Sequence, residues 1–156
     1  MKLMRLTSTL LLTIAAAGLV TGCASTVSLE AAPDSNNVRC ADVTVRLPDS
    51  VDGLAKRLTN AQATGAWGNP ASVLLRCGLP EVLASELPCV TTSEVDWLVD
   101  ASQAPSYRFI TFGRNPATEV IVDSKKVSGA TALDAVAEAI KYIPRDRECA
   151  IGTGIN

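Results

Sequence analysis

The chain has 156 residues, with 14 lysines and arginines against 16 aspartates and glutamates, so its formal net charge is −2 at pH 7. It contains no histidine, which excludes Ser-His-Asp and Cys-His nucleophiles, an imidazole general base and every metal site with a histidine ligand. Basic residues are adjacent only at Lys56-Arg57 and Lys125-Lys126, so the sequence has no basic cluster and a nucleic-acid partner is not expected.

Residues 1–22 have the three parts of a lipoprotein export signal. Lys2 and Arg5 supply a positive start, residues 10–20 a largely apolar run, and Thr21-Gly22 small side chains directly before Cys23. The apolar run is too short for an uncleaved membrane anchor, which needs about 20 residues. The sequence therefore predicts cleavage before Cys23 and a diacylglyceryl group on its sulfur. This anchor would hold the protein on the extracytoplasmic face of the cell membrane.

Cleavage removes 22 of the 156 residues and leaves 134, which is enough for one domain. Residues 23–39 start with the lipidated cysteine and continue with small and polar side chains without a sustained period. They predict a flexible tether with a span of about 20 Å. The folded domain is expected over residues 40–150, followed by a C-terminal tail at residues 151–156.

The first two elements are predicted from short apolar patterns. Residues 42–48 alternate between apolar and polar side chains, which predicts a half-buried strand with Val43, Val45 and Leu47 on the buried face. Residues 51–58 carry apolar side chains at helical spacing and predict a short amphipathic helix. Its apolar positions are Val51, Leu54, Ala55 and Leu58.

Four further strands and a second helix are predicted downstream. The strands are expected at residues 72–78, 94–100, 107–113 and 118–124, with no regular structure at residues 79–88. The last two strands are joined by a short turn and should pair antiparallel. The helix is expected from Thr131 as N-cap up to Pro144. Its apolar stripe consists of Leu133, Val136, Ala137 and Ile140.

These elements predict a single α+β domain. About five strands form a mostly antiparallel sheet, and two helices with one apolar stripe each pack on one of its faces. The opposite face of the sheet is left to meet water or a partner.

Four cysteines remain when Cys23 is committed to lipid, and outside the cytoplasm an even number predicts two disulfides. Three pairings are open. We favour Cys40 with Cys149, which ties the ends of the domain together, and Cys77 with Cys89, which closes a short excursion between strands. No Cys-x-x-Cys pair is present, so neither a four-cysteine zinc site nor thioredoxin-like redox chemistry is expected. We predict no metal and no cofactor.

Seven sequence blocks between Cys40 and Cys149, behind the export signal, resemble the actinobacterial domain-of-unknown-function family 3515. The resemblance implies a secreted or lipid-anchored envelope protein and carries over no catalytic residues. The blocks are CADVTVRLP (40–48), WGNP (67–70), LRCG (75–78), VDW (95–97), TFGRNP (111–116), VDS (122–124) and REC (147–149).

The outward face of the predicted sheet carries charges of both signs on neighbouring strands. They are Arg46, Arg76, Asp96, Asp100, Arg108, Glu119 and Asp123. One interpretation is a solvated face with weak ion pairs. The other is a recognition surface, in which Arg108 and Arg114 hold an anionic group of the envelope while Trp67 or Trp97 offers a flat apolar wall. Trp67 has an alternative role, which is to close one end of the core with its indole N–H on a carbonyl.

Two classes of function are compatible with these residues. The first is a binding or assembly module of the cell envelope, with the membrane and an envelope protein or cell-wall ligand as partners. The alternative is a small hydrolase without histidine that uses carboxylates, for example Asp96 and Asp100, as acid and base. Two residues four apart on one strand lie about 13 Å from each other, beyond the roughly 6.5 to 9.5 Å that such a pair uses. We therefore predict no catalytic residue.

Overall fold

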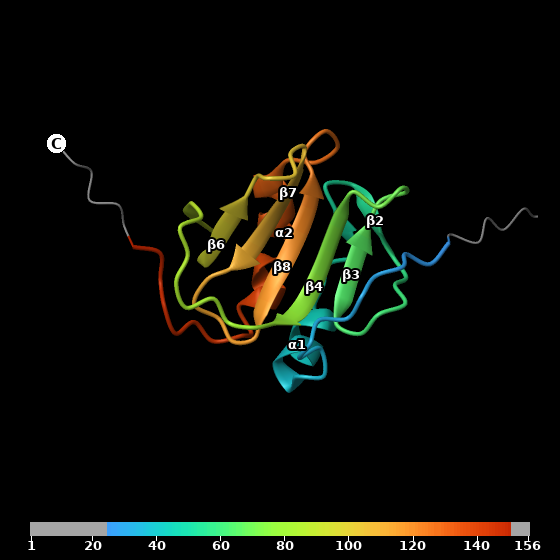
Figure 1. Cartoon of the computed structure of the whole chain (residues 1–156). Coiled ribbons are helices and arrows are strands. Elements are labelled where there is room, and N and C mark those ends of the chain that lie inside the picture. Colours follow the sequence, from blue (N-terminus) through green and yellow to red (C-terminus); the bar gives the residue numbers. More distant parts are fainter. Residues whose placement is uncertain (1–24, 151–156) are drawn as a thin grey trace, which may run out of the picture.

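The computed structural model describes residues 25–150 (Figure 1). The predicted signal peptide at residues 1–22, the lipid-attachment residue Cys23 and the tail at residues 151–156 lie outside the described residues. Within the described range, no helix combines the length and the apolar character needed to cross a membrane.

One antiparallel sheet of eight strands forms the centre of the domain, in the order β1-β2-β3-β4-β8-β7-β6-β5. The α+β class and the antiparallel sheet are confirmed, whereas the prediction of five strands is wrong. The strands are β1 (Ser50–Val51), β2 (Leu54–Arg57), β3 (Thr64–Trp67), β4 (Val73–Leu79), β5 (Cys89–Thr92), β6 (Val95–Asp100), β7 (Ser106–Thr111) and β8 (Ala117–Asp123). The four strands predicted from residue 72 onwards correspond to β4, β6, β7 and β8.

The strand predicted at residues 42–48 is wrong, because the chain there belongs to helix α1 (Val38–Thr44) and its C-terminal turn. Asn37 caps this helix by accepting a hydrogen bond from the backbone N–H of Arg39 at 3.0 Å. Cys40 and Val43 are buried three residues apart, while Val45 is 76% exposed. The apolar residues therefore follow the helical period, and the alternation through Val45 has no structural counterpart.

The helix predicted at residues 51–58 is also wrong, because these residues form the β1–β2 hairpin. Asp52 and Gly53 make the turn with φ of 49° and 74°, and Val51 pairs with Leu54 across it. An Asp-Gly pair with both φ values positive is the usual sequence of a two-residue hairpin turn. The local turn chemistry thus overrides the helical spacing of the apolar side chains.

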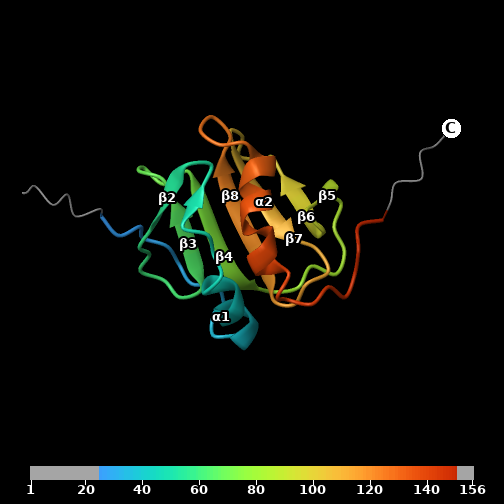
Figure 2. The same cartoon turned by 180° about the vertical axis from the view of Figure 1, so that it is seen from behind.

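Helix α2 (Gly129–Ile140) lies across one face of the sheet, and α1 lies at one end of the domain (Figure 2). The predicted stripe is confirmed, because its four residues are buried at 2% exposure or less. The helix begins after Ser128 rather than at Thr131. Residues of both helices join the same core as Trp67 and Trp97. The indole N–H of Trp67 donates to the Pro48 carbonyl at 2.9 Å, which confirms the core role for this tryptophan.

The disulfides join Cys40 to Cys77 and Cys89 to Cys149, so the predicted pairing is wrong. Because α1 packs against β4, Cys40 faces Cys77 with the two Cα atoms 5.6 Å apart. The chain after α2 returns to the β5–β6 edge, where the backbone N–H of Cys149 donates to Asp96 at 2.9 Å. This contact brings Cys149 next to Cys89, so each bridge fastens a terminal part of the domain to the sheet.

The turn between β5 and β6 is fastened to α2 through Asp134. The hydroxyls of Thr92 and Ser93 donate to its carboxylate, and these bonds lower the pKa of Asp134 below its ordinary value of 3.8. A lowered pKa means that this stabilisation is complete above the unfolded-state pKa and is lost as the pH falls through the folded-state pKa. We expect Asp134→Asn to lower the free energy of unfolding at pH 7 and to flatten its decline below about pH 4. Urea titrations of both proteins at pH 3 to 7 measure this, and parallel curves would contradict it.

Candidate binding groove on the outer face of the sheet

The face of the sheet opposite α2, which we call the outer face, carries a mixture of apolar and charged side chains at its centre. Strands β4 and β8 pair there with Leu74 opposite Ile121 and Arg76 opposite Glu119. Val73, Leu75, Val120 and Val122 alternate with them and are buried in the core on the α2 side. Strand periodicity therefore turns the two pairs Leu74–Ile121 and Arg76–Glu119 towards the outer face.

Residues 25–32, which we call the N-terminal segment, cross this face over β3, from the end of β2 towards β4 (Figure 1). The backbone N–H of Val27 donates to the Leu58 carbonyl at 2.8 Å, and the N–H of Asn60 donates back to Val27 at 3.3 Å. The backbone N–H of Leu29 donates to the side-chain oxygen of Asn60 at 2.8 Å, and Ala32 is 3% exposed. The prediction of a flexible tether is therefore wrong for this segment, which is part of the folded domain.

The chain after the N-terminal segment approaches β4 very closely. The backbone N–H of Asp34 donates to the Gly78 carbonyl at 2.9 Å. Gly78 has φ of 109°, and a Cβ atom on it would lie 2.6 Å from the backbone of Asp34. Only glycine permits both this conformation and this approach. The LRCG block thus contains a residue that fixes where the N-terminal segment enters the domain.

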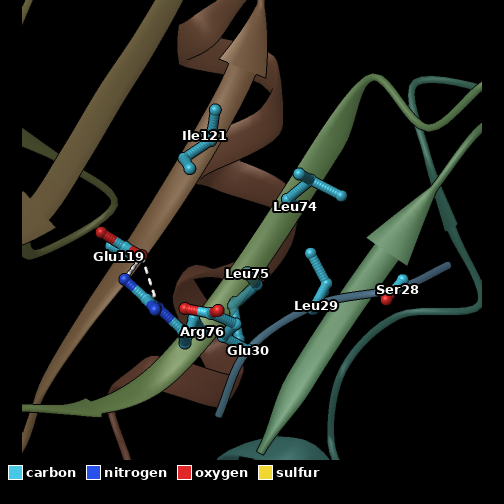
Figure 3. A pocket seen from close by; sticks show the side chains of 8 residues that line it. All are labelled: Ser28, Leu29, Glu30, Leu74, Leu75, Arg76, Glu119 and Ile121. Carbon is cyan, nitrogen blue, oxygen red and sulfur yellow. Dashed lines mark hydrogen bonds and ion pairs between the residues drawn. The ribbon is translucent and has the colours of Figure 1, made fainter. Parts of the chain in front are cut away.

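A groove with a volume of about 330 Å³ lies between the N-terminal segment and strands β4 and β8 (Figure 3). Its size is in the lower part of the range of small-molecule sites, roughly 300 to 1,000 Å³. The N-terminal segment and the two strands supply all of its lining. The lining residues are Ser28, Leu29, Glu30, Leu74, Leu75, Arg76, Glu119 and Ile121.

A buried carboxylate with two arginine partners lies at the charged end of the groove. Glu119 is 3% exposed, and its Oε1 accepts from Nε and Nη2 of Arg76 at 2.7 and 2.6 Å. Its other oxygen accepts from Nε of Arg108 on β7. The two arginine side chains remain 32% and 37% exposed. The arrangement fixes two guanidinium groups side by side with a net charge of +1, held by charge-assisted hydrogen bonds.

The remainder of the outer face towards β5 is covered by other parts of the chain. Leu98, Ile110 and Ala117 form a second apolar cluster, and Val82 from the irregular segment between β4 and β5 packs on it. Arg147 near the end of the domain lies 3.6 Å from Glu81 of the same segment. The groove is thus the uncovered part of the outer face between this cover and the N-terminal segment.

Three of the four residues predicted to form a binding surface are buried elsewhere. Trp67 and Trp97 are 0% exposed and belong to the core. Arg114 is 4% exposed, and its guanidinium donates to the carbonyls of Ile143 and Glu94. Burial lowers the pKa of Arg114. The prediction is therefore wrong for these three residues, and only Arg108 lies beside the groove, through its bond to Glu119.

Among the other charges predicted on the outward face, Asp100 lies opposite Arg108, whereas Asp96 and Arg46 have separate environments. Asp96 is 2% exposed and accepts from Thr91 at 2.5 Å and from the backbone of Cys149. Arg46 follows α1 instead of lying on the sheet, and its guanidinium stacks on Tyr142 at 3.7 Å from the ring centroid. Asp96 is thus committed to structural bonds, and the structure brings Arg76, Arg108 and Glu119 together out of the seven predicted charges.

Sequence reasoning missed the apolar half of the groove and one of its acids, which are Leu29, Leu74, Ile121 and Glu30. The sequence carries a signal for Leu29, because Val27-Ser28-Leu29-Glu30 alternates over four residues inside the predicted tether. Within residues 25–150, no group of three or more Cys, Asp and Glu is placed to hold a metal ion. The lining of the groove combines apolar and charged side chains, which makes it a candidate site for an organic ligand.

Comparison with known proteins finds one family. Neither the curated proteins nor the solved structures contain a match to this chain. The family of proteins of unknown function DUF3515 matches residues 6–147, which include the N-terminal segment, both sides of the groove and three of the four disulfide cysteines. The match extends over most of the 156 residues, so the chain belongs to the DUF3515 family.

Proposed function

We propose that this protein is a lipid-anchored binding module that works outside the cytoplasm, with the groove on the outer face as its binding site. Two observations support the location. Residues 1–22 have the sequence pattern of an export signal, directly before Cys23, and all four cysteines of the described residues are joined in disulfides, which persist in oxidising compartments. The groove supports the binding role.

The observation that carries the binding role is the chemistry of the groove lining. Apolar side chains from β4, β8 and the N-terminal segment lie next to the Arg76–Glu119–Arg108 cluster. An apolar cavity with a few convergent polar groups is the usual form of a ligand site. The two guanidinium groups are already held in place by Glu119, so binding does not have to order them first.

The N-terminal segment also brings the groove close to the proposed anchor. Cys23 precedes Ser25 by two residues, which span at most about 7 Å. The carbonyl of Ser25 accepts a hydrogen bond from Arg57 on β2, so this residue is held against the sheet. A lipid on Cys23 would therefore hold the β2–β3 side of the domain beside the membrane surface.

Photo-cross-linking in the native cells tests this proposal. We expect a photoreactive amino acid at Ile121, which is half-buried in the groove, to give a specific adduct in the membrane fraction. The matched control carries the same amino acid at Glu138 on α2, on the opposite face of the sheet, and should give none.

The same material tests the anchor. Mass spectrometry should find the chain starting at a diacylated Cys23. Equal labelling from Ile121 and Glu138 would exclude the groove as the binding site, and a cytosolic protein with five free thiols would exclude the location.

A further inference from the structure

We infer that the groove binds an anionic amphiphile of the membrane, with its phosphate or carboxylate group at Arg76 and Arg108 and its apolar chain along Leu29, Leu74 and Ile121. This inference rests on the proposed function and names the ligand class of the same groove. Three features of the described residues support it: the separation of apolar and charged lining, the unused donors of the arginines and the distance to Cys23.

The apolar and charged parts of the groove lie at successive positions along the strands. Leu74 and Ile121 form one cross-strand pair, and Arg76 and Glu119 form the pair two residues further along. Leu29 of the N-terminal segment joins the apolar pair as a lining residue (Figure 3). Residues two apart on a strand lie about 7 Å from each other, so a single short ligand reaches both parts.

The charged part favours an anion because the arginines have more donors than Glu119 can use. Each guanidinium carries five N–H donors. The two carboxylate oxygens accept from Nε and Nη2 of Arg76 and from Nε of Arg108. Both side chains are about one third exposed, so the other donors are open to a ligand. Planar guanidinium groups match the oxygens of a phosphate or carboxylate.

Two acidic side chains lie near these arginines and have to be weighed against this attraction. Among the described residues that line the groove, Glu30 is the only acid besides Glu119, and it is exposed at the rim. Asp100 lies opposite Arg108 on the neighbouring strand β6, and its carboxylate accepts from the backbone N–H of Ser102 at 2.9 Å. This bond keeps the carboxylate charged, so Asp100 offsets part of the attraction of Arg108 for an anion. Water screens the exposed Glu30, so its repulsion is modest and can be changed by mutation.

The short connection to the anchor favours a ligand that resides in the membrane. Ser28, the first of the described residues that line the groove, follows Cys23 by five residues, at most about 18 Å of chain. The headgroup layer of one leaflet is about 5 to 8 Å thick. An anchored protein therefore holds the groove near the headgroups, where an amphiphile can enter without crossing water.

The test uses the lipidated protein in phosphatidylcholine nanodiscs and follows the NMR signals of the arginine Nε–H groups. We expect dodecyl phosphate to shift the signals of Arg76 and Arg108 saturably. Inorganic phosphate and dodecyl maltoside, which each lack one half of the ligand, should bind at least about ten times more weakly. If inorganic phosphate bound as tightly as dodecyl phosphate, the apolar chain would contribute nothing and the ligand would not be a membrane amphiphile. If dodecyl maltoside bound as tightly, the anionic group would contribute nothing and the ligand would not be an anion.

A pair of charge variants keeps the test independent of folding. Glu30→Lys removes the exposed acid of the rim, so we expect it to tighten binding of dodecyl phosphate about three- to tenfold. Glu138→Lys makes the same change of net charge on the opposite face and should alter the affinity less than twofold. Equal effects of both variants would overturn the inference.

The cross-linking experiment at Ile121 separates this inference from the proposed function. If Ile121 cross-links only to protein in cells, the inference of an amphiphilic ligand is wrong, but the groove is still a binding site. If Ile121 gives no adduct at all, the proposed binding function is wrong as well.

Discussion

Replacing Cys40 and Cys77 together by alanine is expected to lower the free energy of unfolding by about 4 kcal/mol. The disulfide joins residues separated by 37 positions, and loop closure of this length accounts for nearly all of this value in the chain-entropy model. Both residues are 0% exposed and belong to the main core, so the substitutions also leave space among buried side chains. Urea denaturation under non-reducing conditions at pH 7 measures the change.

The double variant of Cys89 and Cys149 is the matched control. Its separation of 60 positions gives a similar loop term of about 4 kcal/mol. However, Cys149 lies in a segment without regular secondary structure, which can separate from the sheet once the bridge is gone. The native state then regains entropy, and we expect a smaller loss than for Cys40 and Cys77. A larger loss in the control would contradict this, and a peptide map that joins Cys40 to Cys149 would overturn the connectivity itself.

The long periodic segments were predictable from the sequence alone. Helix α2 has four apolar residues on one stripe over eight positions, and the segments of β6, β7 and β8 each alternate or form an apolar run bounded by turn residues. In these segments the local pattern and the tertiary burial agree. The α+β class followed from them, because several strands before a C-terminal helix leave few other architectures.

The N-terminal half failed because its patterns are short and ambiguous. Val43 and Leu47 are four residues apart, so the same apolar residues fit a strand and a helix. The exposure of Val45 decides between them, and only the packing of α1 on β4 determines that exposure. Around Asp52-Gly53 the sequence carries two conflicting signals, a hairpin turn and a helical spacing of apolar residues, and the turn determines the structure.

The groove was predictable only in its charged part. Arg76, Arg108 and Glu119 were placed on one face because strands alternate, and the structure joins them in one cluster. The apolar part depends on the N-terminal segment, whose bonds to Leu58 and Asn60 join residues about thirty positions apart. No local pattern specifies such a contact. The disulfide pairing failed for the same reason, since it follows from where α1 and the final segment return to the sheet.

Arg114→Ala is expected to lower the free energy of unfolding by about 3 kcal/mol without a direct effect on ligand binding. The guanidinium of Arg114 joins the turn before β6, through the Glu94 carbonyl, to the chain after α2, through the Ile143 carbonyl. It is 4% exposed, so alanine leaves two carbonyls without a charged donor and a space where the side chain was. Urea denaturation at pH 7 gives the loss of stability.

Arg108→Ala is the matched control, because it removes the same side chain from a position that is 37% exposed. Glu119 keeps Arg76 as a partner, so we expect a loss of about 1 kcal/mol or less. The effects on binding of an anionic amphiphile should be reversed: Arg108→Ala weakens it, and Arg114→Ala leaves it unchanged at temperatures where the variant is folded. If the Arg114→Ala protein were stable but had lost binding, Arg114 would be a ligand-binding residue, as the sequence alone predicts. The two variants therefore separate an arginine that holds the fold together from one that faces a ligand.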